Sequence, residues 1–267
     1  MKLAVGLLLL LGGLLAGCSD HGNSLQDFPA RSVTLDGKNY QYRVWLPKNR
    51  DPNKKMPVIL FLHGSGARGD DNTSQVDTLF WAIKPVKEKF DFIVVAPQCR
   101  PNTFWGSQEM ADYALATLDQ SVKEFDGDPQ RLYLVGFSLG GYGVWQIAAG
   151  NPGKFAALVP VAGGVVEHPT DRLGRSAIIP SVGAILDSPD PFGAVAKVIG
   201  QTPVWAFHGD KDDSIPVQFS RNIVKALQEN GSTNVRYTEY VGDGHQILGK
   251  AIAEPGLLDW LAAQRLP

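Results

Sequence analysis

Ser138 lies between glycines in the segment VGFSLGGYG, which spans residues 135–143. Gly136 stands two residues before it and Gly140 two residues after it. This G-x-S-x-G spacing is typical of a sharp turn from a strand into a helix, where bulky neighbours would clash and the serine hydroxyl is exposed. The same pattern occurs in ordinary glycine-rich loops, so by itself it does not distinguish a nucleophile from a loop serine.

A serine hydroxyl is a weak nucleophile unless a base takes its proton, and that base is most often a histidine held by a carboxylate. One known arrangement has the chain order serine, acid, histidine. His245 in the segment VGDGHQ suits the last place, and its alternative role is that of a solvated loop histidine. The acidic residues that could complete the set are Asp210, Asp212, Asp213 and Asp243.

Acyl transfer also needs backbone N–H donors that face the developing oxyanion. We expect one donor to be the amide of Leu139, which directly follows the serine. The second should come from the segment HGSGARGDDN, which follows an earlier apolar run, and we assign it to Ser65. Gly66 is the next residue and is a candidate for substrate binding.

Three histidines, His63, His208 and His245, could in principle bind zinc. No H-x-x-x-H spacing occurs among them, and such a spacing is a common signature of histidine zinc sites. We therefore expect packing and loop-shaping roles for His63 and His208. The sequence predicts neither a metal nor an organic cofactor.

The candidate residues follow apolar runs of strand length, which alternate with segments of helix length. Continuous apolar runs are expected where helices cover both faces of a sheet. Ahead of them, two β-rich segments are joined by DGKN, and an Asp-Gly pair is a strong hairpin signal. The pattern predicts an α/β fold with a doubly wound, mostly parallel sheet, an N-terminal antiparallel hairpin and helices on both faces. Such sheets bind ligands at the carboxyl ends of their strands, where the candidate residues lie.

The boundaries of these elements follow from the same pattern. Strands are expected in residues 32–35, 40–46, 56–64, 90–97, 131–137, 155–164, 202–209 and 235–242. Helices are expected in residues 74–89, 108–125, 139–149, 217–229 and 257–264.

The composition favours one globular domain, which we place at residues 31–267. Of the 267 residues, 44% are hydrophobic and 19% are charged, and we find no linker, charge block or internal repeat. The formal net charge of −2 argues against a nucleic-acid-binding surface. The sequence does not indicate an oligomeric state.

The first 17 residues have the features of a secretory signal peptide. A lysine precedes an apolar run of residues 3–16, which is too short to span a bilayer comfortably. The run ends in LAGC at Cys18, which resembles the bacterial lipobox. That resemblance implies cleavage before Cys18 and attachment of lipid to its sulfur. We therefore expect an exported lipoprotein of the bacterial cell envelope, held at a membrane by its lipid, with residues 18–30 as a tether.

From about Tyr40 to Pro267 the chain resembles the α/β-hydrolase esterases related to dienelactone hydrolase, polyhydroxybutyrate depolymerase and feruloyl esterase, a group that includes predicted peptidases. The likeness is strongest in APQCR, DPQRLYLVGFSLGGYGVWQIAAGNPGKFAALVPVAGG, PVWAFHGDKDDSIPV and GDGH. The segment HGDKDDSIP is similar to the H-G-x-x-D-x-x-V-P stretch of esterases and serine peptidases of this fold, whose fifth residue is the catalytic acid. The resemblance therefore implies an α/β-hydrolase fold and Asp212 as the acid, with Asp213 as the alternative.

The chain departs from this group in an insert of residues 165–201. Its small apolar residues, prolines and glycines suit a cap over the site or a wall of an acyl pocket, and a surface excursion without such a role is the alternative. Ala162 stands where some relatives have a cysteine, so Cys99 has no disulfide partner once Cys18 is lipidated. The strand-end setting of Cys99 favours a buried, inert thiol.

Trp105, in PNTFWG, follows another expected strand. It could stack on an aromatic or sugar ring of the substrate, or it could pack against the sheet.

Together these features predict a serine carboxylesterase in which Ser138 attacks the ester carbonyl, His245 takes its proton and Asp212 orients the imidazole. The expected substrate is a small-molecule or polysaccharide-linked ester. A serine peptidase with the same residues is one alternative, disfavoured because the chain has no propeller or other gating domain. A silent lipoprotein that binds an envelope partner is the other, and it would have no need for all three residues and the flanking glycines.

Overall fold

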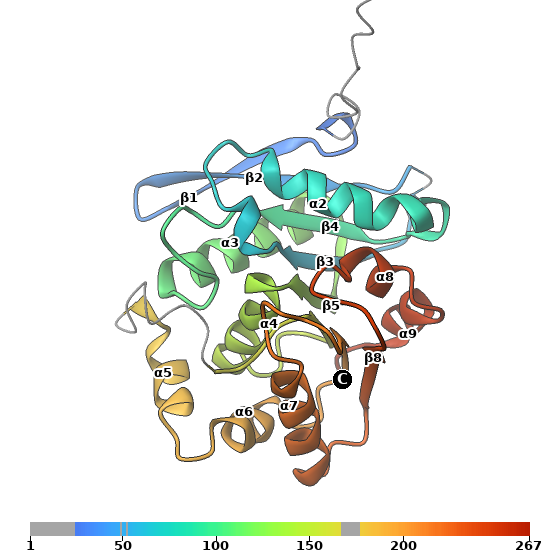
Figure 1. The fold of residues 1–267 in the computed structure, drawn as a ribbon. Helices are drawn as coiled ribbons and strands as arrows, with labels where there is room; N and C mark the ends of the chain where they lie inside the picture. The colour runs from blue at the N-terminus through green and yellow to red at the C-terminus, as the bar shows by residue number, and fades with distance from the viewer. Residues whose placement is uncertain (1–24, 49, 52, 167–176) are drawn as a thin grey trace, which may run out of the picture.

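The computed structural model describes residues 25–48, 50–51, 53–166 and 177–267. The predicted signal peptide, Cys18 and the first part of the tether lie outside the described residues. The described chain forms an eight-stranded sheet in the order β1-β2-β4-β3-β5-β6-β7-β8 (Figure 1). The strands are β1 (Ala30–Leu35), β2 (Lys38–Trp45), β3 (Met56–Leu62), β4 (Ile93–Pro97), β5 (Gly127–Phe137), β6 (Ala157–Val161), β7 (Val204–Gly209) and β8 (Val235–Tyr240).

The sheet is mostly parallel, because β2 pairs antiparallel with β1 and with β4 whereas the pairs from β4 to β8 are parallel. The two-residue turn between β1 and β2 consists of Asp36 and Gly37, whose φ angles are 48° and 75°. Positive φ at both positions is typical of the tight turn that matches the twist of a hairpin. The sequence prediction of an N-terminal antiparallel hairpin ahead of a parallel sheet is confirmed.

Helices cover both faces of the sheet, and a separate hydrophobic core lies under each layer. Residues of α3 (Gln108–Glu124), α4 (Leu139–Gly150), α5 (Pro180–Leu186), α6 (Pro191–Ile199) and α7 (Gln218–Glu229) belong to one core. Residues of α2 (Ser74–Ile83), α8 (Leu248–Ile252) and α9 (Leu257–Ala263) belong to the other. The strands contribute alternate side chains to the two cores, as expected for a doubly wound sheet.

One predicted helix is divided in the structure. The segment expected to be a helix over residues 74–89 forms α2 and then a separate 3₁₀ helix, η2 (Lys84–Lys89). Pro85 occupies the start of η2, and proline has no N–H to continue the hydrogen bonding of the preceding helix. The remaining predicted helices agree with the structure to within a residue or two.

The described part of the insert consists of residues 165–166 and 177–201, and its helices belong to the helical layer. Its helices α5 and α6 pack against α4, and α6 also packs against α7. Val182 and Ile199 are buried in the core on this face. These residues therefore act as ordinary core helices, and a cap or acyl-pocket role for the insert stays a prediction that also involves residues 167–176, which lie outside the described residues.

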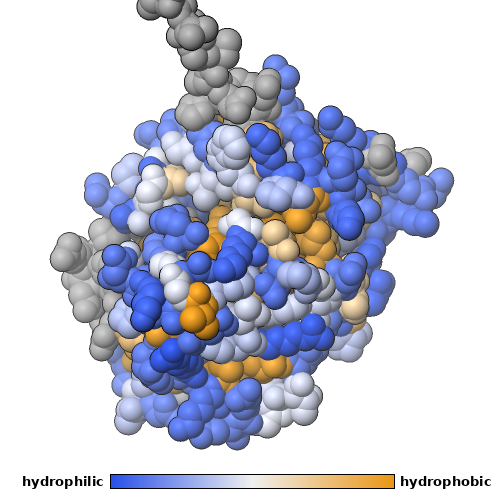
Figure 2. All heavy atoms as spheres, turned by 45° about the vertical axis from the view of Figure 1, so that its right-hand side comes forward, coloured by the Kyte–Doolittle hydropathy of each residue, from blue (hydrophilic) through white to orange (hydrophobic). Residues whose placement is uncertain are grey.

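The face shown in Figure 2 is mostly hydrophilic, with its apolar side chains in small areas between polar ones. Among the described residues, the exposed large hydrophobic side chains are Trp81 and Val241. Single exposed apolar side chains are ordinary on protein surfaces, so they do not indicate a docking site. None of the helices formed by the described residues has the length and apolar character that a bilayer span requires.

Candidate active site

Ser138 lies at the turn where β5 passes directly into α4. Its backbone has φ 57° and ψ −115°, a strained conformation for a residue with a side chain, and such strain recurs at functional sites. The Ser138 N–H donates to the carbonyl oxygen of Val161 in the neighbouring β6, at 2.9 Å. The strained turn is therefore braced by the sheet, and it has the geometry that the G-x-S-x-G spacing predicts.

The glycines around Ser138 are required by close backbone contacts. A Cβ on Gly136 would lie 2.2 Å from the carbonyl oxygen of Gly140. A Cβ on Gly140 would lie 1.8 Å from the carbonyl oxygen of Leu62, at the end of β3. Gly64 is also close, because its Cβ would lie 3.4 Å from that of Ser138. The first turn of α4 is thus pressed against the end of β3, which leaves no room for side chains at Gly136 and Gly140.

Ser138, His245 and Asp212 form one chain of hydrogen bonds. His245 Nε2 lies 2.8 Å from Ser138 Oγ, and His245 Nδ1 lies 2.7 Å from Asp212 Oδ2. A carboxylate can only accept, so Nδ1 carries the proton and Nε2 accepts from the serine hydroxyl. The structure therefore brings together the three residues that the sequence analysis selected, with an imidazole beside the serine and a carboxyl group behind the imidazole.

The remaining acidic candidates have other partners. Asp213, the alternative acid, is exposed. Asp213 contacts Ser214 Oγ, and Asp210 accepts from the N–H of Gly242. Asp243 pairs with Lys250 Nζ.

Asp212 is held by further donors in addition to His245. Its side chain has no exposed surface, and its Oδ1 accepts from the backbone N–H groups of Ser214 at 2.9 Å and Ile215 at 2.8 Å. His208 Nε2 lies 3.1 Å from Asp212 Oδ2. The sequence analysis assigned only packing and loop shaping to His208, so this contact was missed. A histidine four residues before the acid is visible in the sequence, but the loop geometry that joins the two side chains is not.

The loop that carries His245 packs on the end of β7. A Cβ on Gly209 would lie 2.4 Å from the carbonyl oxygens of Asp243 and Gly244. On the other side, the centroid of the Phe137 ring lies 5.0 Å from that of the imidazole of His245. Close backbone packing and this ring contact hold the imidazole above the turn at Ser138.

The two predicted oxyanion donors border this turn. Leu139 is the first residue of α4, and Ser65 is the first residue of the short 3₁₀ helix η1 (Ser65–Ala67) that follows β3. N–H groups in the first turn of a helix have no partner within the helix and can bind an anion. A Cβ on Gly64, next to Ser65, would lie 3.4 Å from that of Ser138, so the backbone of this loop passes close to the serine. The placement suits the predicted donors, and their role stays a prediction.

The loop after η1 is held by side-chain hydrogen bonds. Arg68 donates to the carbonyl oxygen of Thr103 at 3.1 Å. Burial favours a raised pKa for Asp71, but the hydrogen bonds that its carboxylate accepts outweigh burial and hold that pKa well below its usual range. Those donors are the N–H and Oγ of Ser74, the N–H of Thr73 and Nε2 of Gln98.

Trp105 packs under the same loop. Its side chain has no exposed surface, its indole N–H donates to the carbonyl oxygen of His63 at 3.0 Å, and the two rings meet edge to face. A fully buried ring cannot stack on a substrate, so the substrate-stacking role suggested for Trp105 is replaced by the packing alternative. Gly66, the other candidate for substrate binding, is exposed, and its role stays a prediction.

His63 is buried and neutral. Its Nδ1 donates to the carbonyl oxygen of Gly64 at 2.7 Å, and its Nε2 accepts from the N–H of Cys99 at 2.9 Å. Burial lowers the pKa of His63 to about 4, and it raises the pKa of the Cys99 thiol to about 12. His63 therefore shapes the loop, as expected, and the thiol of Cys99 is buried and unreactive.

The burial of His63 predicts a loss of stability in mild acid. The unfolded chain takes up a proton on this residue below about pH 6.5, whereas the native state stays neutral until about pH 4. The free energy of unfolding should therefore fall by about 3 kcal/mol between these two pH values because of this group. We expect urea denaturation to show a smaller fall for His63→Gln than for the unchanged protein. Equal pH dependence in the two proteins would contradict this account, since the acidic residues contribute equally to both.

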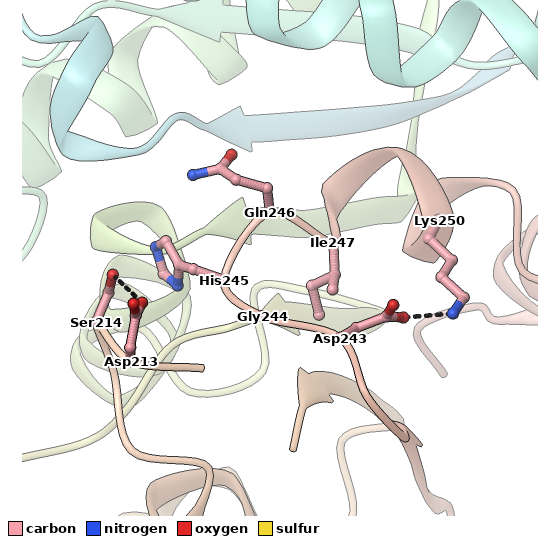
Figure 3. Close-up of a pocket in the computed structure, with 8 residues that line it drawn as sticks. All are labelled: Asp213, Ser214, Asp243, Gly244, His245, Gln246, Ile247 and Lys250. Atoms are coloured by element: carbon pink, nitrogen blue, oxygen red, sulfur yellow. Dashed lines mark hydrogen bonds and ion pairs between the residues drawn. The ribbon is translucent and has the colours of Figure 1, made fainter. Parts of the chain in front are cut away.

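An open pocket of about 450 Å³ lies beside His245 (Figure 3). One wall carries Asp213, and the opposite side carries the ion pair of Lys250 with Asp243. The remaining lining residues are Ser214, Gly244, His245, Gln246 and Ile247. The pocket beside the base is therefore polar and charged, and no residue of the insert helices lines it.

The described residues contain no group of three or more His, Cys, Asp or Glu side chains that could hold a metal ion. His63 and His208 are engaged in separate hydrogen bonds at the ends of β3 and β7. The two histidines thus occupy different places in the sheet, which does not favour the zinc alternative.

Comparison with known proteins relates the chain to hydrolases. The sequence profile of the Dienelactone hydrolase family matches residues 97–250. The chain is 34% identical over 143 residues to dipeptidyl-peptidase 5 of Porphyromonas gingivalis, a match that covers 49% of this chain and 20% of that protein. It is 27% identical over 196 residues to a bifunctional acetylxylan esterase/xylanase of Neocallimastix patriciarum, covering 72% of this chain and 24% of that protein.

Comparison with solved structures also relates the chain to hydrolases. A solved thermostable esterase matches with a TM-score of 0.72 at 30% identity, covering 91% of this chain and 64% of that one. The chain spans 20% to 24% of the length of the first curated relatives that it matches. The names of the matched proteins include both esterases and peptidases, so the similarity establishes a hydrolase of the α/β-hydrolase fold.

Proposed function

Because the chain belongs to the dienelactone hydrolase family, we propose that it hydrolyses carboxylic esters with Ser138 as the nucleophile. In this proposal His245 is the general base and general acid, and Asp212 holds the imidazole. The observation that carries the proposal is the continuous hydrogen-bonded chain from Ser138 Oγ through both nitrogens of His245 to Asp212 Oδ2. A loop serine without a catalytic role would have no need of a base and an anion in line behind it.

The acylation step follows from this chain of hydrogen bonds. Ser138 Oγ attacks the ester carbonyl carbon while His245 Nε2 takes the hydroxyl proton, and the carbonyl electrons move to the oxygen. The amides of Leu139 and Ser65 donate to that oxyanion. As the intermediate collapses, the bond to the alcohol oxygen breaks, His245 Nε2 returns the proton to that oxygen, and an acyl-serine remains.

Deacylation repeats these steps with water. His245 Nε2 takes a proton from a water molecule, whose oxygen attacks the acyl carbon, and collapse returns the proton to Ser138 Oγ. His245 must contact the departing alcohol, because it returns a proton to the alcohol oxygen. The polar pocket beside His245 is therefore the place where we expect the alcohol portion to bind. We therefore propose substrates whose alcohol portion is polar, such as an acylated carbohydrate.

Peptide hydrolysis is the second candidate, because one matched relative is named a dipeptidyl-peptidase and is 34% identical over 143 residues. An amide needs stronger leaving-group protonation than an ester, but the same residues could perform both reactions. The two candidates therefore differ in relative rates rather than in the residues used.

The test is a comparison of kcat/KM for p-nitrophenyl acetate, butyrate and octanoate, acetylated xylan and dipeptidyl p-nitroanilides. We expect kcat/KM for the preferred ester to exceed that for every anilide by about 100-fold or more. This ratio corresponds to a difference of nearly 3 kcal/mol in transition-state stabilisation. A dipeptidyl anilide that is cleaved faster than all the esters would establish the peptidase instead. Turnover of none of these substrates would favour the silent binding protein.

We also propose that the mature protein is exported, begins at Cys18 and carries lipid on that sulfur, which tethers the hydrolase domain to a membrane. The predicted tether of residues 18–30 is too long, because its residues 25–30 pack on the hydrolase domain: Phe28 is fully buried in a core and Asp27 pairs with Lys87 at 2.7 Å. Mass spectrometry of the protein from a bacterial membrane fraction should find a lipid-modified N-terminal Cys18. The variant Cys18→Ser should accumulate with residues 1–17 still attached, and recovery of an intact, unmodified Met1 terminus from the unchanged protein would refute the proposal.

A further inference from the structure

We propose that His208 is a positioning residue that fixes the carboxylate of Asp212 for its work on His245. The proposal rests on the function assigned above to Ser138, His245 and Asp212. It adds a second histidine in polar contact with the acid, besides His245.

The protons of His208 can be assigned from its neighbours. His208 Nε2 lies 3.1 Å from Asp212 Oδ2 and 3.0 Å from the carbonyl oxygen of Ile215. Both neighbours are acceptor oxygens, so Nε2 carries a proton. It donates a hydrogen bond to the Ile215 carbonyl oxygen, and its positively polarised N–H group lies beside Asp212 Oδ2. Nδ1 lies 2.7 Å from Ser220 Oγ in α7 and accepts from that hydroxyl. Burial lowers the pKa of His208, which keeps the ring neutral and leaves Nε2 as its one donor.

This arrangement fixes both oxygens of the carboxylate. Oδ1 accepts from two backbone N–H groups of the loop that follows Asp212. Oδ2 accepts from His245 Nδ1 and lies 3.1 Å from His208 Nε2. Without His208, the electrostatic contact between its N–H group and Oδ2 would be lost. The carboxylate could then rotate away from His245 Nδ1, and an imidazole that is less well aligned would take the proton of Ser138 less often.

The backbone explains how His208 reaches the acid. His208 is the second-last residue of β7, and Asp212 lies in the loop directly after it. Asp212 N–H donates to the carbonyl oxygen of Gly209 at 3.3 Å, so the loop curls back over the strand end. That turn brings the side chain at position 212 over the ring at position 208, four residues earlier.

A purely packing role is the competing explanation, because His208 has no exposed surface. The variants His208→Leu and His208→Gln separate the two. Leucine fills the space without an N–H, whereas glutamine keeps an N–H donor at similar reach. A packing role would make leucine the better replacement, and a positioning role would make glutamine the better one.

The experiment measures kcat and KM for the preferred ester in the purified protein, in both variants and in Ser138→Ala. For His208→Leu we expect kcat to fall by about 10-fold to 100-fold, the effect of one hydrogen bond to a charged group, with KM within about twofold. For His208→Gln we expect kcat to stay within about fivefold of the unchanged protein. Equal kcat in the two variants, or a lower kcat in the glutamine variant, would overturn the proposal. If His208→Leu does not fold, Ser220→Ala replaces it, because Ser220 Oγ holds His208 Nδ1. An unchanged kcat in both Ser220→Ala and His208→Gln would count against the proposal.

A spectroscopic readout separates failure of this inference from failure of the proposed function. The proton between His245 Nδ1 and Asp212 should give a downfield N–H signal in proton NMR, and this signal does not depend on turnover. We expect it to shift or broaden in His208→Leu and to be retained in His208→Gln. An identical signal in the unchanged protein and in folded His208→Leu would refute positioning by His208. Ester turnover that survives in Ser138→Ala would refute the proposed function and leave the result for His208 standing.

Discussion

Replacing Ser138 with alanine is expected to reduce kcat/KM for ester hydrolysis by about 10⁴-fold or more, to a residual rate that comes from binding and the oxyanion donors alone. The nucleophilic oxygen is removed, so no acyl-enzyme forms and His245 Nε2 loses its partner at 2.8 Å. Alanine is small enough for the strained turn between Gly136 and Gly140. The kinetic effect should therefore appear without a large change in thermal stability.

The measurement is steady-state kinetics of the unchanged protein and the variant, with melting temperatures recorded for both. Ser32→Ala is a matched control, because Ser32 is exposed in β1 at the edge of the sheet, whereas Ser138 follows the central strand β5. We expect its kcat/KM to stay within about threefold of the unchanged protein, as for a surface change away from the reacting atoms. Activity that is retained in folded Ser138→Ala would remove Ser138 from the mechanism.

The change Asp212→Asn should have the second-largest effect, a fall in kcat of about 10³-fold to 10⁴-fold. An amide at this position removes the negative charge behind His245, and its NH₂ group can turn toward Nδ1. Nδ1 would then act as the acceptor and Nε2 would carry the proton, which is the wrong tautomer for taking a proton from Ser138. KM should change little, because the side chain of Asp212 has no exposed surface with which to contact substrate.

Asp213→Asn provides the matched comparison, since the same chemical change is made one residue later. Asp213 is exposed and contacts Ser214 Oγ, so we expect its loss to alter kcat by less than about fivefold. The reverse result, with a large loss in Asp213→Asn and a small one in Asp212→Asn, would show that the alternative acid is the correct one.

The fold was predictable from the sequence where local signals and burial agree. The Asp-Gly turn, the apolar runs and the helix segments between them predicted the hairpin, the parallel strands and both helical layers. These signals are strong because a strand covered on both faces must be apolar along its length, and a tight hairpin turn needs positive φ at two positions.

The elements that were missed depend on tertiary packing. Helices α5, α6 and α8 are short, and their small apolar residues become helical against α4, α7 and α2 rather than through a clear periodicity. Residues 84–89 have a helical composition, but Pro85 changes the hydrogen bonding from Lys84 onward. Short elements of this kind gain most of their stability from the surface on which they pack.

In the candidate site, too, the sequence predicted some features, whereas others depend on tertiary packing. The selection of Ser138, Asp212 and His245 used chain order and strand ends, and the structure brings these three together. The role of Trp105 could not be settled from the sequence, because an aromatic residue after a strand can face solvent or the core, and here its indole N–H reaches His63. The contact of His208 with Asp212 depends on the curl of one loop, which the residue types alone do not specify.

The central claim is that Ser138 is the nucleophile, and covalent labelling tests it most directly. The protein would be treated with a fluorophosphonate, which reacts with activated serines, while residual esterase activity and intact mass are followed in parallel. The account predicts that activity falls in proportion to the incorporation of one phosphonyl group, that peptide mapping finds this group on Ser138, and that Ser138→Ala is not labelled. Full activity with no label, or a label that maps to another serine as activity is lost, would contradict it.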